Sequence, residues 1–476
     1  MKPLTMDEVL AATRGTMINP RPASSVRGVS TDSRTVQPGE LFFALIGPNH
    51  DGHNFIVEAL RRGAVGAVVS RRESATEEAT DAGIIIAVDD TTAALGRLAA
   101  YHRRQLAAQI VAVTGSNGKT TTKDMIHAVL SAASKGRCSP RSFNNHVGVP
   151  LTLLSAEGSD EYLVVEIGTN APGEVHALSQ IARPDVAVIT GISPTHLEGL
   201  TSIEGVAEEK ASLLRSLRRG GLAALNVDHP ALVRHLPDNE DHWRQVGFGF
   251  AEGADLRATD VRTVTDGISF RVNDKFEVRL NMLGRHNAVN ALAAVAVGRR
   301  FGLEHEQIAQ ALATVSTPSM RLQLERIGPI TVINDAYNAN PESVSSALEV
   351  LTELPATGRR VAVLGDMREL GEQSQALHVE LGRRVGRSGL QLLIAVGEYA
   401  EVVSRAAARD AGDRLEVRRF ADVGDAMDRI AGMLAPADLV LVKASRALEL
   451  ERLMEPIRRH FGTAGHEPAA EAATQP

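Results

Sequence analysis

A glycine-containing turn between an apolar run and a helical pattern carries the strongest chemical signal in this sequence. The β-branched and apolar residues 110–113 lead into the turn 115–118, after which Lys119 and Thr120 open a helical pattern. The backbone N–H groups of such a turn point at phosphates, and the helix N-terminus favours negative charge. Lys119 would reach the β- and γ-phosphates of a nucleotide, and the Thr120 hydroxyl would hold Mg²⁺. The nucleotide contacts predicted from this segment are Gly115, Ser116, Asn117, Gly118, Lys119, Thr120 and Thr121.

The turn departs at one position from the standard phosphate-binding motif. That motif has a further upstream glycine, and Val113 stands where it is expected, so the predicted loop is tighter. The alternative is an ordinary strand-to-helix turn that happens to be rich in glycine. The run Gly118-Lys119-Thr120 between a strand and a helix favours the phosphate site.

Two further side chains follow predicted buried strands. Glu166 lies at the end of the apolar run 162–167, and His196 lies in the loop after the run 185–190. In open α/β sheets ligands bind outside the carboxyl ends of the strands, so both residues are expected at the crevice. A carboxylate beside a phosphate loop is a natural Mg²⁺ ligand, whereas imidazole is an unusual one. The alternatives are a helix-capping or surface role for Glu166 and a solvated loop position for His196.

Lys210 lies in a stretch of predicted helix with acidic neighbours. Glu208 and Glu209 precede it, which is typical of an exposed, charged helix face. From spacing alone, an exposed lysine is the simplest interpretation.

Two asparagines near the start of another predicted helix are separated by about one turn. Asn287 and Asn290 therefore share a face, and their amides could read the edge of an adenine base. Ordinary helix capping by Asn287 is an equally good interpretation of the spacing.

Polar residues also end two strands of the last third of the chain. Asp335 follows the apolar run 330–334 and suits a ribose hydroxyl, although asparagine-rich turns such as 334–341 are common without function. Lys443 ends the run 438–443 and could neutralise a phosphate or a substrate carboxylate.

Composition limits the class of protein. The chain has 476 residues, of which 43% are hydrophobic, so about three domains with conventional cores are expected. Its formal net charge of −7 argues against a nucleic-acid-binding surface. Its one cysteine, Cys138, excludes a disulfide framework. The first ten residues lack the apolar stretch of a secretory signal, and no apolar run is long enough to span a bilayer. We therefore expect a cytoplasmic protein.

The order of apolar runs predicts an α/β fold with three domains. Short strands and a helix near residues 91–106 make a mixed α/β N-terminal domain, and alternating strands and helices from residue 110 make a central parallel sheet with an appended hairpin at 268–280. A Thr-Pro-Ser linker near 314–321 precedes a doubly wound, Rossmann-like third domain. The predicted domains are 1–107, 108–315 and 316–462, followed by a tail, 463–476, whose composition is typical of disorder.

With these pieces in order, the chain resembles the Mur ligases over essentially its whole length apart from the tail. The stretches that carry the resemblance are Asp32–Arg34, Pro38–Ala44, Asp51–His53, Thr114–Thr120, Asn144–Pro150, Glu166–Asn170, His196, Lys210, Gly284–Asn290, Asp335–Pro341, Gly365–Gly371 and Val442–Arg446. Ser116 stands where Thr is common in the loop, and Ala444 where Gly is common, and neither change removes a needed functional group.

The resemblance implies an N-terminal domain for a UDP-linked substrate, a central ATPase domain and a third domain that closes over the nucleotide. Lys210 matches a lysine that is carbamylated in this family, so that its carbamate helps to hold Mg²⁺. Thr120, Glu166, His196 and Lys210 are then the expected metal site, with two Mg²⁺ ions. Arg321 and Asp335 match positions that approach the γ-phosphate and the ribose after closure. The expected catalytic residues are Lys119, Lys210, His196 and Arg321.

The resemblance also implies the substrates. Within the family, the stretches 335–341 and 365–371 are similar to the branch that adds D-alanyl-D-alanine to UDP-N-acetylmuramoyl-tripeptide. The Asp-Asn-Pro-Arg signature of the alternative branch, which adds a diamino acid to the dipeptide, does not occur in the sequence. The expected substrate contacts are Ser33, Arg34, Asn144, Asn145, Thr169, Asn170, Tyr337 and Asn338.

The reaction implied by the family is ATP-driven amide formation through an acyl phosphate, in peptidoglycan precursor synthesis. ATP and Mg²⁺ are the expected cofactors, and Lys119 and Arg321 would neutralise the anionic reactants together with the metal. A monomer that binds neither nucleic acid nor membrane is expected.

Overall fold

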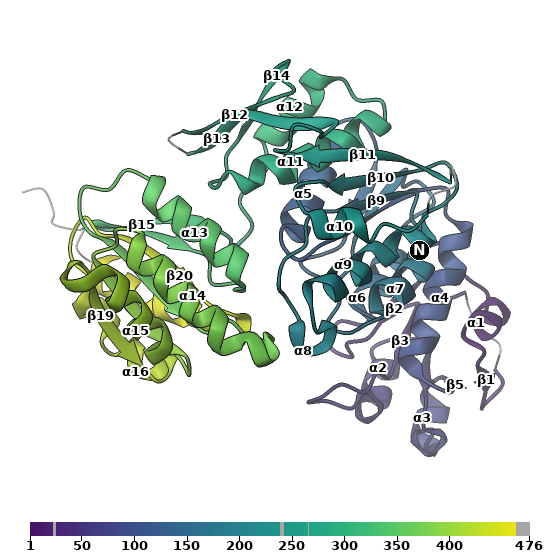
Figure 1. The fold of residues 1–476 in the computed structure, drawn as a ribbon. Helices are drawn as coiled ribbons and strands as arrows, with labels where there is room; N and C mark the ends of the chain where they lie inside the picture. Colours follow the sequence, from purple (N-terminus) through teal and green to yellow (C-terminus); the bar gives the residue numbers. More distant parts are fainter. Residues whose placement is uncertain (22–24, 239–241, 265, 463–476) are drawn as a thin grey trace, which may run out of the picture. The chain divides into compact units, whose positions relative to one another are not determined.

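The structure is a computed structural model that describes residues 1–21, 25–238, 242–264 and 266–462 (Figure 1). The predicted disordered tail lies outside the described residues. The chain divides into two compact units. Unit 1 contains Met1–Gly191, Ala207–Leu256 and Ala293–Ile308, and unit 2 contains Ile192–Val206, Arg257–Leu292 and the chain from Ala309 onward. The three domain boundaries predicted from the sequence stay predictions.

The N-terminal part of unit 1 is a five-stranded sheet in the order β1-β5-β4-β3-β2. Strands β2 to β5 are parallel, and β1 is antiparallel to β5. Buried apolar residues such as Phe42, Ile56 and Ile85 form its core. The elements are α1 (Met6–Thr13), β1 (Thr16–Met17), β2 (Gly28–Ser30), β3 (Glu40–Phe43), α2 (Ile56–Arg61), β4 (Gly66–Val69), α3 (Glu77–Ala82) and β5 (Ile84–Ala87).

A larger parallel sheet forms the rest of unit 1, with its strands in the order β11-β10-β9-β6-β8-β7. Its central strands are buried throughout, as their continuous apolar sequences predicted. The strands are β6 (Gln109–Thr114), β7 (Gly136–Cys138), β8 (Tyr162–Glu166), β9 (Val186–Ile189), β10 (Gly221–Asn226) and β11 (Trp243–Gly249). Because the strands are parallel, the loops that follow β6, β8 and β9 leave the sheet at the same edge.

Helices accompany this sheet. Helix α4 packs against α6 and α7, and α5 packs beside β8. The buried Arg103 of α4 donates to Asp185 at 2.8 Å and to the carbonyl oxygen of Ala182 at 2.8 Å, which fixes α4 to the start of β9. The sheet's helices are α4 (Thr91–Gln105), α5 (Lys119–Ser131), α6 (Gly148–Ser155), α7 (Glu174–Ala182) and α10 (Pro230–Arg234). Helix α8 (Leu197–Leu200) belongs to unit 2, and α9 (Ile203–Ala211), α11 (His286–Arg300) and α12 (His305–Ala313) each contain residues of both units.

The predicted hairpin is confirmed, and it belongs to a meander of three antiparallel strands. Strand β12 (Leu256–Val264) pairs with β13 (Gly267–Val272), which pairs with β14 (Phe276–Leu280). The turn between β13 and β14 contains Asn273 and Asp274 at φ 51° and 57°, a conformation that asparagine and aspartate tolerate.

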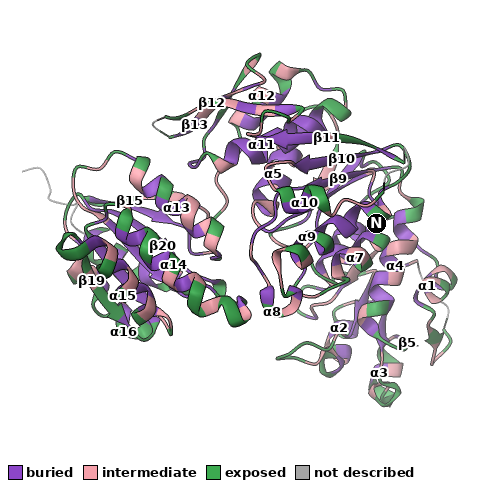
Figure 2. Ribbon diagram, viewed as in Figure 1, coloured by how far each residue is buried: buried purple, intermediate pink, exposed green. Residues whose placement is uncertain are grey.

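The C-terminal part of unit 2 is a six-stranded sheet in the order β15-β16-β20-β17-β18-β19, parallel except for β15. Alternate residues of β17 face two separate cores: Ala362 packs with α13, α14 and α15, and Val361 packs with α16 and α18. Figure 2 shows the strands buried between helices whose outer faces are exposed. This is the doubly wound domain that the sequence predicted. Its strands are β15 (Gln323–Ile327), β16 (Ile330–Asn334), β17 (Arg360–Gly365), β18 (Leu392–Val396), β19 (Glu416–Phe420) and β20 (Leu439–Lys443).

The helices of this sheet are α13 (Pro341–Glu353), α14 (Ser374–Arg387), α15 (Ala400–Ala411), α16 (Val423–Met427), α17 (Ile430–Met433) and α18 (Met454–Phe461). Among the described residues, no helix is both long and apolar enough to cross a lipid bilayer.

Candidate nucleotide and metal site

The glycine turn after β6 is tightly held against the end of β9. A Cβ atom on Gly115, at φ +149°, would lie 2.0 Å from the Thr190 hydroxyl oxygen, so only glycine fits. The Ser116 N–H donates to the carbonyl oxygen of Gly191 at 2.9 Å. Gly118, at φ 78°, is the residue from which α5 starts. The turn therefore has one fixed backbone conformation directly before a helix N-terminus.

Lys119 folds back over this turn. Its Nζ atom donates to the carbonyl oxygens of Gly115 at 2.6 Å and Ser116 at 3.2 Å. The ammonium group thus lies beside the backbone that would surround a phosphate, as the motif predicts. The next two residues, Thr120 and Thr121, are buried in the first turn of α5.

A carboxylate and a hydroxyl meet beside the loop. The Thr120 hydroxyl donates to Glu166 Oε2 at 2.9 Å, and the Asn144 amide donates to Glu166 Oε1 at 2.9 Å. The Glu166 side chain is buried, and its backbone N–H donates to the Ser139 hydroxyl at 2.9 Å. The surface interpretation of Glu166 is therefore wrong, because the carboxylate is fixed on both oxygens within the sheet edge.

These donors fit Mg²⁺. The ion prefers oxygen ligands and usually takes one or two from the protein, with phosphates and water completing its shell. Thr120 and Glu166 supply a hydroxyl and a carboxylate oxygen within hydrogen-bond distance of each other. In the described part of the chain, no group of three or more His, Cys, Asp or Glu side chains is arranged to hold a metal.

Lys210 is buried, so its interpretation as an exposed lysine is wrong. It is 1% exposed at the end of α9, in unit 1. Burial, with a smaller contribution from the nearby Lys119 ammonium, lowers the pKa of Lys210 to about 7. The uncharged amine, which is nucleophilic, is therefore accessible to Lys210 near neutral pH.

The predicted substrate residues of unit 1 differ from one another in burial and in hydrogen-bond partners. Ser33 is buried and donates to Glu58 at 3.1 Å, and the exposed Arg34 pairs with Asp32 at 2.7 Å. The Asn145 side chain accepts the backbone N–H groups of residues 147 and 148 at the start of α6, which is a structural contact. Asn170 is exposed, and its backbone N–H donates to Glu174 at 2.7 Å. None of these contacts tests a substrate role.

His196 belongs to unit 2 and lies before α8 at φ 54°. Its Nδ1 atom lies 2.5 Å from Glu369 Oε2, also in unit 2, and this hydrogen bond lowers the pKa of Glu369. With Nδ1 engaged by a carboxylate, Nε2 is the nitrogen left for a further ligand. Because of this contact, His196 is not the freely solvated loop residue of the alternative interpretation.

Asp335 and Lys443 form a buried ion pair at the carboxyl ends of β16 and β20. Lys443 Nζ lies 2.6 Å from Asp335 Oδ2 and also donates to the carbonyl oxygen of Asn338 at 2.8 Å. Asp335 Oδ1 accepts the Leu322 N–H at 3.0 Å. Beside them, the Arg321 guanidinium stacks over the Tyr337 ring, 4.0 Å from its centroid. The sequence predicted these groups separately, and the structure brings them together.

The two asparagines of α11 face one another, as their spacing predicted. Asn290 Nδ2 donates to Asn287 Oδ1 at 2.9 Å, and Asn287 Nδ2 donates to the carbonyl oxygen of Leu283 at 2.8 Å. Both are buried. Asn287 therefore acts as a side-chain donor to the preceding turn, and the capping interpretation, which needs an accepting side chain, does not describe it.

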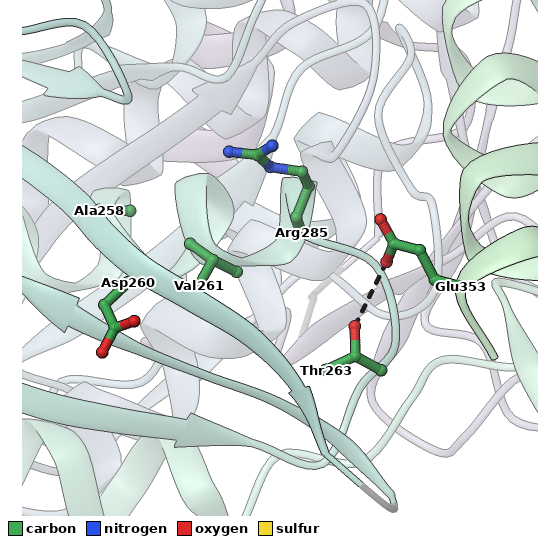
Figure 3. A pocket seen from close by; sticks show the side chains of 6 residues that line it. All are labelled: Ala258, Asp260, Val261, Thr263, Arg285 and Glu353. Carbon is green, nitrogen blue, oxygen red and sulfur yellow. Dashed lines mark hydrogen bonds between the residues drawn. The ribbon is translucent and has the colours of Figure 1, made fainter. Parts of the chain in front are cut away.

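A separate hollow of unit 2 contains none of the predicted site residues. Figure 3 shows it beside β12, with Arg285 and Glu353 on its rim and the Thr263 hydroxyl donating to Glu353 at 3.3 Å. The lining is Ala258, Asp260, Val261, Thr263, Arg285 and Glu353.

Comparison with known protein families shows which family the chain matches. Three family models match consecutive stretches: Mur ligase family, catalytic domain, over residues 25–103; Mur ligase middle domain over 113–298; and Mur ligase, glutamate ligase domain, over 320–446. A curated relative from Bacillus subtilis is 34% identical over 95% of this chain and 97% of its own length. The chain belongs to the Mur ligase family. Its three-domain α/β architecture follows from these matches and from the mixed α/β sheets described above.

Two curated relatives of this Mur ligase carry the same name. The Bacillus subtilis protein and one from Escherichia coli, 33% identical over 91% of this chain and 94% of its own length, are both named UDP-N-acetylmuramoyl-tripeptide–D-alanyl-D-alanine ligase. A crystal structure of MurF from Acinetobacter baumannii has a TM-score of 0.86 at 30% identity, covering 96% of this chain and 99% of that one. MurF from Thermotoga maritima, solved in complex with ADP, has a TM-score of 0.78 at 28% identity, with coverages of 92% and 99%.

Sequence reasoning missed the structural roles of two residues, Asn144 and Glu209. Asn144 was predicted as a substrate contact, and the structure shows it holding the Glu166 carboxylate. Glu209 was interpreted only as an acidic neighbour of Lys210, yet its side chain is 6% exposed. A buried position could have been suspected from the apolar residues Val206 and Ala207 on the same helix.

Proposed function

We propose that this chain joins D-alanyl-D-alanine to UDP-N-acetylmuramoyl-tripeptide and converts ATP to ADP and phosphate. The observation that carries the proposal is the similarity to ligases of that name over nearly the full length of both chains, third domain included. The fixed phosphate loop with Lys119, and the ADP complex of a similar MurF, support ATP as the co-substrate. Dependence on ATP favours a cytoplasmic reaction, and we retain a monomer as the expected state.

The reaction has two steps. The terminal carboxylate of the tripeptide attacks the γ-phosphorus, the bond to the β,γ-bridging oxygen breaks, and an acyl phosphate and ADP result. The free amine of D-alanyl-D-alanine then attacks the acyl carbon, loses a proton, and expels phosphate to leave the amide. Both reactants of the first step are anionic, so positive groups must offset their repulsion.

Different residues of the chain have different roles in this reaction. Lys119 neutralises the transferred phosphoryl group from within the loop, and Arg321 approaches it from the third domain. Asn287 and Asn290 bind the adenine, and Asp335 the ribose. Mg²⁺, held by Thr120, Glu166 and His196, would supply further positive charge at the phosphates. Closure of the third domain about the linker 314–319 would exclude water, which would otherwise hydrolyse the acyl phosphate.

Lys210 contributes as a carbamate in this proposal. Its neutral amine attacks CO₂, and loss of one proton leaves an anionic carboxylate on the side chain. The lowered pKa of Lys210 supports this step, because the charged ammonium has no lone pair with which to react. The product is an oxygen ligand suited to a hard cation, which the ammonium is not.

The test is turnover with defined substrates. Purified protein with ATP, Mg²⁺, UDP-N-acetylmuramoyl-tripeptide and D-alanyl-D-alanine is expected to release ADP and phosphate in equal amounts, and the product mass is expected to equal the pentapeptide. ADP release without amide formation would mean a nucleotide hydrolase, and no release would contradict the proposal.

A further inference from the structure

Glu209 is a buried carboxylate that the proposed mechanism does not use. It precedes Lys210 at the end of α9, and its residue is 6% exposed. Its two oxygens accept the backbone N–H groups of Gly173 and Val175, each at 2.7 Å, and the Thr169 hydroxyl lies 3.2 Å from Oε1. All of these donors belong to one segment, the end of the loop after β8 and the start of α7, within unit 1.

The contacts make Glu209 the N-terminal cap of a helix that lacks its own. Helix α7 starts from Gly173, at φ 86°, which has no side chain to accept the first N–H groups. Glu209 accepts two of them from another helix, and a negative charge is favourable at this position. Val175 is buried, so its N–H group would be costly to leave unpaired.

The same loop is fixed at its other end. Glu174 accepts the backbone N–H groups of Asn170 at 2.7 Å and Ala171 at 3.2 Å. The segment 168–173, which follows the Glu166 strand, is therefore held by two carboxylates. The side chain of Asn170 stays exposed between them. Because the backbone of the segment 168–173 is held at both ends, the loop presents the Asn170 side chain in a fixed position.

We propose that Glu209 is a positioning residue that holds the loop 168–173 in register with Lys210, so that one side chain aligns the acceptor-binding loop with the metal-side lysine. The proposal rests on the proposed function, because it assigns this loop to the UDP-N-acetylmuramoyl-tripeptide. Glu209 touches neither nucleotide nor metal in this account. Its effect reaches the reaction through the loop, whose backbone it holds.

The test compares Glu209→Gln with Glu208→Gln in the full-length protein. Glu208 is the matched control, since it is the adjacent carboxylate, with a side chain 69% exposed and 4.0 Å from Arg215. Glu209→Gln places an amide against backbone donors, so the loop loses at least one strong acceptor. We expect the KM for UDP-N-acetylmuramoyl-tripeptide to rise about tenfold or more, with the KM for ATP changed less than about twofold. Glu208→Gln is expected to match wild type in both.

A second readout reports on the loop without turnover. Amide hydrogen exchange of the peptide that covers residues 169–176 is expected to accelerate in Glu209→Gln and to stay unchanged in Glu208→Gln. If Glu209→Gln fails to fold, Glu209→Asp carries the same test, because it keeps the charge beside Lys210 but is one methylene too short to reach both N–H groups. It is expected to raise the acceptor KM in the same way.

The outcomes separate the two proposals. Wild-type protein that cannot use the tripeptide contradicts the proposed function, whatever Glu209 does to the loop. Active wild type with an unchanged acceptor KM in the folded Glu209 variants overturns the positioning role. Equal rises of the KM for tripeptide and for ATP, with lost thermal stability, would likewise overturn it, because they would mark Glu209 as a general stabiliser of the fold.

Discussion

Thr120 and Glu166 lie 2.9 Å apart, hydroxyl to carboxylate, although 46 residues separate them in the sequence. The contact joins the first turn of α5 to the end of β8. It places a hydroxyl and a carboxylate oxygen side by side next to the phosphate loop. Asn144 holds the second carboxylate oxygen and fixes the orientation of the pair.

Glu166→Gln tests the metal role of this pair. The amide keeps the shape of the side chain but removes its negative charge, so Mg²⁺ binding weakens while the strand stays intact. We expect the Mg²⁺ concentration for half-maximal activity to rise about 10- to 100-fold. A Mg²⁺ titration of phosphate release measures it, with Glu161→Gln, an exposed carboxylate just before the start of the same strand, as control. An unchanged Mg²⁺ requirement would rule Glu166 out as a ligand.

Lys119→Ala tests the phosphate loop. Its ammonium lies over the turn and packs in no core, so its loss removes charge stabilisation and leaves the fold nearly intact. We expect kcat to fall by about 100-fold or more, with the free energy of unfolding changed by less than about 1 kcal/mol. Turnover and urea denaturation are measured on the same preparation. Lys135→Ala, which removes a lysine whose side chain is 61% exposed, is the control. Near-normal turnover of Lys119→Ala would contradict the assignment.

The stability of the protein is expected to depend on pH through Lys210. Burial lowers its pKa to about 7 from an ordinary value of 10.5, so between these pH values the unfolded chain binds a proton that the folded chain has released. Stability contributed by this group therefore rises with pH across the window. Below pH 7 the folded protein bears the full cost of burying the ammonium group.

Lys210→Met removes that cost. In buffers free of CO₂, we expect its Tm to exceed that of wild type by about 2 °C or more near pH 6.5, and the difference to shrink as pH rises toward 10. Calorimetric scans at several pH values measure it, beside Lys135→Met as an exposed control. A difference that does not vary with pH would mean that Lys210 is not titrating as a buried amine.

The Asp335–Lys443 pair is expected to behave as a coupled unit. The Lys443 side chain is 2% exposed, so Asp335→Asn leaves a buried charge without its partner, at a cost of about 3–5 kcal/mol of unfolding free energy. Asp335→Asn/Lys443→Met removes both charges, and we expect it to be more stable than Asp335→Asn alone. Denaturant unfolding of wild type, Asp335→Asn, Lys443→Met and the double variant gives the interaction energy. Strict additivity of the two substitutions would contradict the coupling.

Much of the fold was predictable because strands buried on both faces have continuous apolar sequences. The run at 330–334 coincides with β16. Edge strands were missed for the converse reason. Strand β19, Glu416–Phe420, has its charged side chains in solvent and only one buried residue, so its sequence resembles a loop. Its pairing with β18 supplies the order that its own residues do not specify.

The site was predictable where its signal is local. The glycine turn, Lys119 and Thr120 are adjacent, and Glu166 follows from the rule about strand ends. The burial of Lys210 was missed, because two acidic residues before a lysine are typical of an exposed helix face, whereas Glu209 and Lys210 are both buried. The burial of its neighbour Glu209 follows from a tertiary contact: the carboxylate accepts backbone N–H groups at the start of α7. Neither partner of that contact indicates the other in sequence.

The most direct test of the central claim is a comparison of acceptors. Phosphate release with ATP, Mg²⁺ and D-alanyl-D-alanine is measured with UDP-N-acetylmuramoyl-tripeptide and, in parallel, with UDP-N-acetylmuramoyl-dipeptide. The account predicts release with the tripeptide alone and a pentapeptide product by mass. Use of the dipeptide together with a free diamino acid, and no reaction of the tripeptide, would contradict it and assign the chain to the other branch of the family.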